Sequence, residues 1–150
     1  MDARFSYREA AVRGASPVQL VICLYEQAIS DLRGAIVALE KGNVEARTRG
    51  INHALKVVGH LQGSLDLERG GNVARNLYRF YSLLRASLIE AQLKQSAGII
   101  QQQILHLAQV RESWVEVERA AAASQPSLAG PAPATPGISS RESPVTDWNA

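Results

Sequence analysis

This 150-residue sequence has little cysteine, no long apolar run and little net charge, and each of these limits the compartment or the partners that the protein can have. It has one cysteine, Cys23, so no disulfide can form within the chain, and the reducing cytosol is the expected compartment. No run approaches the ~18 apolar residues that span a bilayer, and the charged opening stretch does not read as a secretory signal. The formal net charge of +2 is too small to indicate a nucleic-acid partner. We therefore expect a cytosolic protein without membrane insertion.

Aromatic residues make up only 5% of the chain, whereas Ala, Leu, Val and Gln are abundant, which favours helix over strand. A first helix is predicted to begin at Ser16, because Ser16 and Gln19 form a capping box and Pro17 stands at the first helical position. Apolar residues then recur every three or four positions up to Leu39, and Gly42 follows as a left-handed C-terminal cap.

Three further helices follow by the same criteria. Asn43 is predicted to cap the second helix, whose apolar stripe leads up to the glycine pair. Gly70 or Gly71 is predicted to close that helix, and Asn72 to cap the third. The pattern breaks over 95–98, and a fourth helix runs from there past Trp114. Because no strand precedes the glycines and no phosphate-binding motif surrounds them, they are interpreted as a helix boundary.

Short connections between long helices predict an all-α fold, an antiparallel up-down four-helix bundle over residues 16–123. Residues 1–15 are expected to form an N-terminal segment with a short helix. Residues 124–150 are rich in Pro, Ser and Ala, which predicts a disordered tail. Trp148 in this tail is interpreted as an exposed aromatic, with a docking role as the alternative.

The sequence offers little that could perform chemistry. His53, His60 and His106 lack the companions that a metal site needs, and Cys23 lies in an apolar run, so no metal site, cofactor or enzymatic activity is expected. One alternative stays open. The stretch from His53 to Lys56 resembles the H-x-L-K core of histidine-phosphotransfer domains, in which His53 would carry the phosphoryl group, although Val57 replaces the glycine that follows there.

The helices carry more apolar residues than the roughly three per seven that a bundle core uses. A wide core explains part of this surplus. A groove that receives a foreign amphipathic helix, or a face that forms a homodimer, would explain the rest.

The sequence resembles the FliS family of flagellin-specific export chaperones over about residues 7 to 118. The resemblance is carried by short motifs spread along the chain: A-S-P at Ala15–Pro17, Leu20, L-Y-E at Leu24–Glu26, E-K-G-N at Glu40–Asn43, S-L-D at Ser64–Asp66, Gly70 and Gly71, Asn76 and Leu77, Tyr81, and Arg111 with Trp114.

This resemblance implies a chaperone that binds the disordered C-terminal segment of flagellin, prevents premature filament assembly, and helps deliver the subunit to the flagellar export gate as a chaperone–flagellin complex. No nucleotide would be needed. The N-terminal segment around Tyr7 is expected to cover the groove when no client is bound. Contacts to the client are expected from apolar residues of the first three helices: Leu20, Leu24, Tyr25, Ala54, Val58, Leu61, Leu77, Tyr81 and Leu84.

Overall fold

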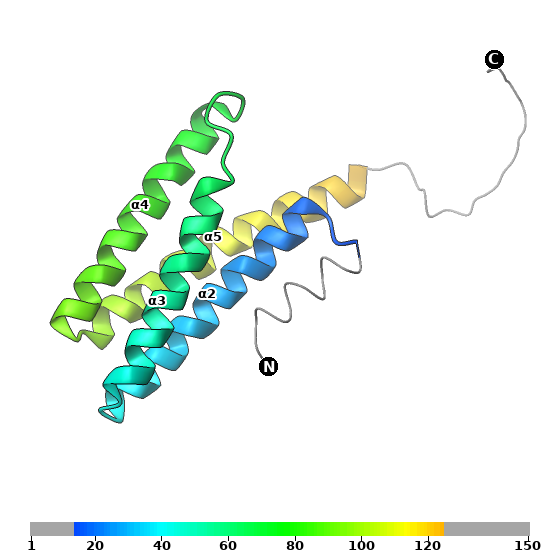
Figure 1. The fold of residues 1–150 in the computed structure, drawn as a ribbon. Coiled ribbons are helices and arrows are strands. Elements are labelled where there is room, and N and C mark those ends of the chain that lie inside the picture. The colour runs from blue at the N-terminus through cyan, green and yellow to red at the C-terminus, as the bar shows by residue number, and fades with distance from the viewer. Residues whose placement is uncertain (1–13, 125–150) are drawn as a thin grey trace, which may run out of the picture. The chain divides into compact units, whose positions relative to one another are not determined.

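The computed structural model describes residues 14–124, which form four helices and, within that range, no strand (Figure 1). They are α2 (Pro17–Glu40), α3 (Val44–Gly63), α4 (Gly71–Lys94) and α5 (Ala97–Ser124). The chain divides into two compact units after Glu116, so the last turns of α5 belong to the second unit and the bundle discussed below comprises residues 14–116. Successive helices run in opposite directions, which confirms the predicted antiparallel four-helix bundle (Figure 1).

The predicted start of the first helix is confirmed at α2. The backbone nitrogen of Gln19 donates to Ser16 Oγ at 3.1 Å, and the backbone nitrogen of Ser16 donates to Gln19 Oε1 at 2.9 Å. These two bonds satisfy donors that a helix N-terminus would otherwise leave unpaired. The end of α2 also follows the prediction, because Gly42 has a φ of 71°, a conformation that side chains with a Cβ rarely adopt. Asn43 then caps α3 through a 3.0 Å bond from the nitrogen of Ala46.

The glycine pair differs from the prediction. Helix α3 ends at Gly63, before the glycines, and Asn72 lies inside α4. Between the helices, Asp66 Oδ1 accepts from the backbone nitrogens of Glu68 and Arg69, so this side chain forms a turn of its own. Gly70 precedes α4, and a Cβ there would lie 2.5 Å from Ala74 Cβ. The pair therefore starts α4: Gly70 leaves room for Ala74, and Gly71 has a φ of 60°, which residues with a Cβ rarely adopt.

The junction between α4 and α5 lies inside the predicted break. Gln95 takes a left-handed conformation with a φ of 52° after the last turn of α4. The hydroxyl of Ser96 then accepts from the nitrogen of Ile99 at 3.1 Å and caps α5.

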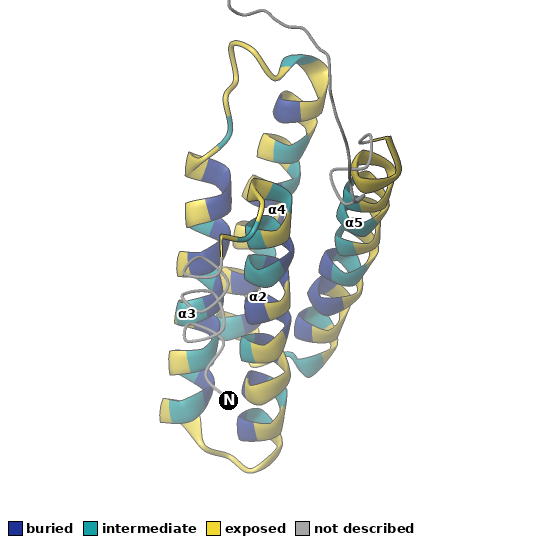
Figure 2. Ribbon diagram, turned by 90° about the vertical axis from the view of Figure 1, so that its right-hand side faces the viewer, coloured by how far each residue is buried: buried dark blue, intermediate teal, exposed yellow. Residues whose placement is uncertain are grey.

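The core lies where the four helices face one another, and Figure 2 shows the buried residues along the inner sides of the helices. Its largest fully buried side chains are Tyr25, Tyr81, Leu32, Ile51, Leu84, Leu88, Ile100, Leu107 and Val58. Helices α2 and α3 approach closely at Gly50, where a Cβ would lie 3.0 Å from the backbone oxygen of Asp31. The absence of a side chain at this position permits that approach.

The seams between helices differ in chemistry. The α3–α4 seam is polar, since Gln62 donates to Ser82 Oγ at 2.7 Å and accepts from Arg85 Nη1 at 2.8 Å. The Cα atoms of α2 and α3, and of α3 and α4, come within 8 Å of each other, whereas among the described helices α5 has no such approach. Helix α5 is held instead by long side chains, including the ion pair of Arg111 with Glu26. The α4–α5 seam is consequently wide.

Candidate functional site

A hollow of about 270 Å³ lies at the end of the bundle where α4 begins. We call it the Trp114 pocket. Its lining comes from all four helices and the α3–α4 turn and is mainly apolar, with Ser64, Asp66 and Gly70 beside the apolar residues Val21, Leu61, Leu65, Val73, Ala74, Leu77, Tyr81 and Trp114. Val73 is 68% exposed at its edge, whereas Tyr81 is buried at its floor. The pocket thus offers apolar side chains to whatever enters it.

A second hollow of about 520 Å³ lies between α4 and α5, and we call it the Phe80 pocket. Its lining from α4 is mostly apolar, and that from α5 is mostly polar but uncharged: Phe80, Leu83, Leu84, Ser87, Gln103, His106, Gln109 and Val110. Leu83 is 62% exposed at this pocket, so its side chain is accessible to a ligand.

The two pockets lie at successive levels of α4 and α5. Helix α4 contributes to the first from Val73 onwards and to the second up to Ser87, while α5 contributes Trp114 to the first and Val110, one turn away, to the second. We call this combined surface the α4–α5 groove. At 1.5 Å per residue, the stretch of α4 from Val73 to Ser87 is roughly 21 Å long. The groove is therefore long enough for about four turns of a foreign helix.

The floor of the groove contains a buried polar chain. The hydroxyls of Tyr25 and Tyr81 lie 2.7 Å apart, and Trp114 also hydrogen-bonds to the Tyr25 hydroxyl. Burial raises the pKa of Tyr25 above its ordinary 10.0, and the hydrogen bonds from Tyr81 and Trp114 oppose that rise only in part. Burial, with the neighbouring Tyr25 phenol, raises the pKa of Tyr81 as well. Both phenols therefore stay neutral, and together they join α2, α4 and α5 beneath the groove.

These raised pKa values predict a loss of stability in alkali. Above pH 10.0 the unfolded chain releases the protons of Tyr25 and Tyr81, whereas the folded chain keeps them. The free energy of unfolding therefore falls as pH rises through this range. At lower pH both states keep these protons, so the two tyrosines cause no pH dependence there. Urea unfolding at a series of pH values around and above this point measures the slope. The Tyr81→Phe variant should have a shallower slope than Tyr78→Phe, which alters an exposed tyrosine. Equal slopes would contradict the prediction.

Comparison with known proteins identifies the chain. Residues 1–121 match the family described as flagellar protein FliS. The chain is 34% identical over 110 residues to the flagellar secretion chaperone FliS of Salmonella typhimurium, covering 73% of this chain and 82% of that protein. The chain belongs to the FliS family. It is also 31% identical over 106 residues to the flagellar secretion chaperone FliSB of Pseudomonas aeruginosa, covering 71% of this chain and 84% of the relative.

The motifs that suggested FliS have visible structural roles. Ser16 caps α2, Asp66 and Gly70 shape the α3–α4 turn, and Arg111 and Trp114 attach α5 to α2. The resemblance, which the family match confirms, is thus carried in part by residues that determine helix ends and contacts between helices.

The nine contact residues predicted from the sequence occupy different environments. Six are buried in the core: Tyr25, Ala54, Val58, Leu61, Tyr81 and Leu84. Leu20, Leu24 and Leu77 are partly exposed. The α4–α5 groove brings together four of the nine, namely Leu61, Leu77, Tyr81 and Leu84. Tyr7 lies outside the described residues, as do Trp148 and most of the two terminal segments, so the expectations for them stay predictions.

Several groove residues were not among the predicted contacts: Val21, Leu65, Val73, Phe80, Leu83, Val110 and Trp114. The signal for three of them was present in the sequence. Val73 and Phe80 belong to the predicted apolar stripe of α4, and Leu83 lies beside it, on a second line that a helix with one partner face does not need.

His53 occupies a different position from that of an exposed phosphoryl acceptor. Its Nδ1 lies 2.5 Å from Asp31 Oδ2, and Gln27 donates to the other carboxylate oxygen at 2.8 Å. A carboxylate at this distance would repel a phosphoryl group, and Val57, where phosphotransfer domains have glycine, is nearly buried. Nothing in this geometry favours the phosphotransfer alternative. Among residues 14–124, no group of three or more His, Cys, Asp or Glu side chains could hold a metal ion.

None of the four described helices combines the length and the apolar character that crossing a membrane requires.

Proposed function

We propose that this FliS-family protein is a cytosolic export chaperone that binds the C-terminal segment of flagellin in the α4–α5 groove. The bound segment is withheld from filament polymerisation and is delivered to the flagellar type III export apparatus as the chaperone–flagellin complex. Binding alone accounts for this activity, so no cofactor is required.

The observation that carries the proposal is the pair of pockets that α4 and α5 line between Val73 and Ser87. A disordered segment that folds on binding loses about 2–5 kcal/mol of the gross interaction energy to ordering. A single small pocket offers too little apolar surface to offset that loss, whereas two pockets in succession can accept the apolar residues that a helix places at i, i+3, i+4 and i+7.

The rim of the groove gives a reason for selectivity. Ser87, Gln103 and Gln109 surround the Phe80 pocket, and they can hydrogen-bond to uncharged polar side chains. At this pocket a charged side chain on the flank of the client would lose hydration without gaining an opposite charge, whereas Asp66 at the Trp114 pocket could pair with a basic one. We expect the part of the client helix that covers the Phe80 pocket to be apolar on one face and uncharged beside it.

Trp114 provides a direct test, because the sequence has two tryptophans and a Trp148→Phe variant leaves Trp114 alone. Titration with a tryptophan-free flagellin C-terminal peptide should shift the emission of Trp114 to shorter wavelength and saturate, since the peptide displaces water from the Trp114 pocket. A scrambled peptide of equal composition is the control. If calorimetry detects binding but the emission of Trp114 does not change, the client binds away from the Trp114 pocket. If calorimetry detects no binding, the proposed function is wrong.

A further inference from the structure

The charges of the bundle are unevenly distributed among its helices. Helix α4 carries four basic side chains and one carboxylate, whereas α2 carries one basic side chain and three carboxylates. The weak net charge of the whole chain conceals this difference. The α4 side of the protein is therefore positive, although the sequence total suggests no such surface.

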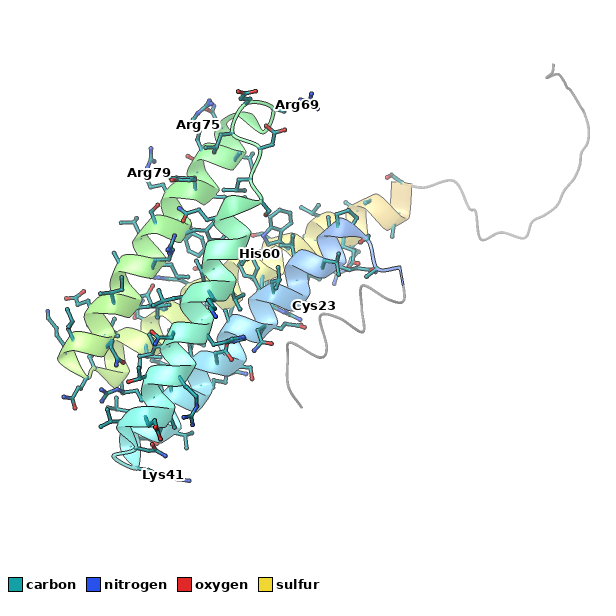
Figure 3. All side chains as sticks on the ribbon, viewed as in Figure 1. Cys23, Lys41, His60, Arg69, Arg75 and Arg79 are labelled. Atoms are coloured by element: carbon teal, nitrogen blue, oxygen red, sulfur yellow. The ribbon has the colours of Figure 1, made fainter. Side chains whose placement is uncertain are left out.

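Three arginines of α4 lack a carboxylate partner within residues 14–124. Arg75 donates to the amide oxygen of Asn72, and Arg85 donates to the amide oxygen of Gln62. Arg79 has no ion pair in this part of the chain. By contrast, Arg111 of α5 is paired with both Glu26 and Glu112. Figure 3 shows Arg75 and Arg79 projecting outward from the first half of α4.

These arginines share a face with large exposed apolar residues. One stripe of α4 starts at Arg75 and continues in steps of three or four residues through Tyr78, Ser82, Arg85, Ile89 and Leu93. Arg79 lies beside this stripe, one turn beyond Arg75. Tyr78 is 45% exposed and Ile89 is 52% exposed. We call this stripe the basic face of α4. It lies beside the α3–α4 seam, on the other flank of α4 from Leu83 and the groove.

We propose that the basic face of α4 is a second docking surface, which binds an acidic amphipathic helix of another protein while the α4–α5 groove holds its client. Unpaired arginines next to an exposed tyrosine are the composition that protein interfaces favour. Carboxylates of the partner would pair with Arg75 and Arg79, and its apolar residues would cover Tyr78 and Ile89. The stripe from Arg75 to Leu93 is roughly 27 Å long, which suits a helical partner of about five turns.

An acidic protein segment fits this surface better than a nucleic acid or a membrane does. Three arginines on one helix, separated by apolar side chains, offer few contacts to a continuous polyanion. An extended polyanion or an anionic bilayer would also meet exposed carboxylates next to these arginines in the chain, such as Glu68 of the α3–α4 turn and Glu90 of α4.

The test uses the full chain and a fluorescein-labelled synthetic acidic amphipathic helix, with glutamates on one face and leucines on the other, in anisotropy titrations at about 50 and 200 mM NaCl. The Arg75→Glu/Arg79→Glu double variant should bind this peptide about tenfold or more weakly, and the wild-type affinity should fall with salt more steeply than that of the variant. Arg33→Glu reverses one exposed charge on α2, half the charge change of the double variant, and should stay within about twofold of wild type.

Four results would overturn the proposal: unchanged peptide binding by the double variant, equal weakening by Arg33→Glu, tighter binding of an anionic vesicle or an RNA oligomer than of the peptide, or an equal loss of flagellin-peptide binding in the double variant. The last result would make the basic face part of the client site and leave the proposed function intact. If the double variant does not fold by circular dichroism, Arg75→Gln/Arg79→Gln replaces it, with Arg33→Gln as its control.

Discussion

A Leu83→Glu variant should lose binding of the flagellin C-terminal segment by about a hundredfold or more, while its helical content stays that of the wild type. Leu83 lines the Phe80 pocket and is 62% exposed, so a glutamate there is hydrated in the free protein. When a client helix covers it, the carboxylate loses water without gaining a partner, and about 3 kcal/mol of affinity is lost.

The matched control is Leu105→Glu. Leu105 is 54% exposed on α5 and does not line either pocket, so the same substitution adds the same charge at a comparable exposure. Its affinity should stay within about twofold of wild type. Calorimetry with the flagellin peptide and circular dichroism at 222 nm measure both variants. If Leu83→Glu binds as tightly as Leu105→Glu, the client does not occupy the Phe80 pocket.

Val73→Glu extends the same reasoning to the other end of the groove. Val73 is the most exposed apolar residue of the Trp114 pocket, so this variant should lose affinity by a similar factor if one client helix spans both pockets. If only one of the two variants loses affinity, the client occupies only the pocket at that end of the groove.

A Leu107→Ala variant should be less stable than wild type by about 2–5 kcal/mol. Leu107 is fully buried, and α5 has no close backbone approach to another described helix, so its attachment depends on side chains of this kind. Removing most of one leucine leaves a cavity that the surrounding helices fill only in part. Loss of α5 would also remove one wall of the groove.

Leu105→Ala is the control for this second prediction, because it deletes the same atoms two residues away at an exposed position. Its stability should stay within about 0.5 kcal/mol of wild type. Urea unfolding followed at 222 nm gives both values. If the two variants unfold at the same urea concentration, α5 is not part of the cooperative unit and the groove has a mobile wall.

The buried phenols connect stability and function in this protein. Tyr25, Tyr81 and Trp114 form one hydrogen-bonded chain that joins three helices, and Tyr81 and Trp114 also line the Trp114 pocket. A client that touches this pocket therefore touches the residues that hold α5 in place. The alkaline unfolding experiment tests how much the buried phenols of this group contribute to stability. The Trp114 titration tests whether a client contacts the same group.

The sequence specified the helix ends wherever a local hydrogen bond decides them. Ser16 and Asn43 cap the helices that were predicted from them, because a side-chain oxygen and a backbone nitrogen three residues away need no distant partner. Asn72 carried the same signal and was wrong as a cap. Asp66 forms the preceding turn and Gly70 packs against Ala74, so α4 begins before Asn72.

The candidate site was only partly predictable from the sequence, because the accessibility of a side chain depends on residues that are distant in the chain. The apolar pattern identified Tyr25 and Leu84 as inward-facing, which they are, but such a pattern cannot tell a side chain sealed by its own bundle from one left for a foreign helix. That distinction depends on how closely neighbouring helices approach. Large residues such as Phe80 and Trp114 line the wide α4–α5 seam, whereas Gly50 lets α2 and α3 close together.

By itself, the sequence determined the four helices, their antiparallel order and the FliS family, since these follow from periodicity, caps and motifs along one chain. Only the tertiary structure decided which apolar residues stay accessible, that α4 and α5 line two pockets, and that Arg75, Arg79 and Arg85 have no carboxylate partner within residues 14–124. Exposure and ion pairing are properties of distances between helices, and those distances are set by the side chains of both neighbours at once.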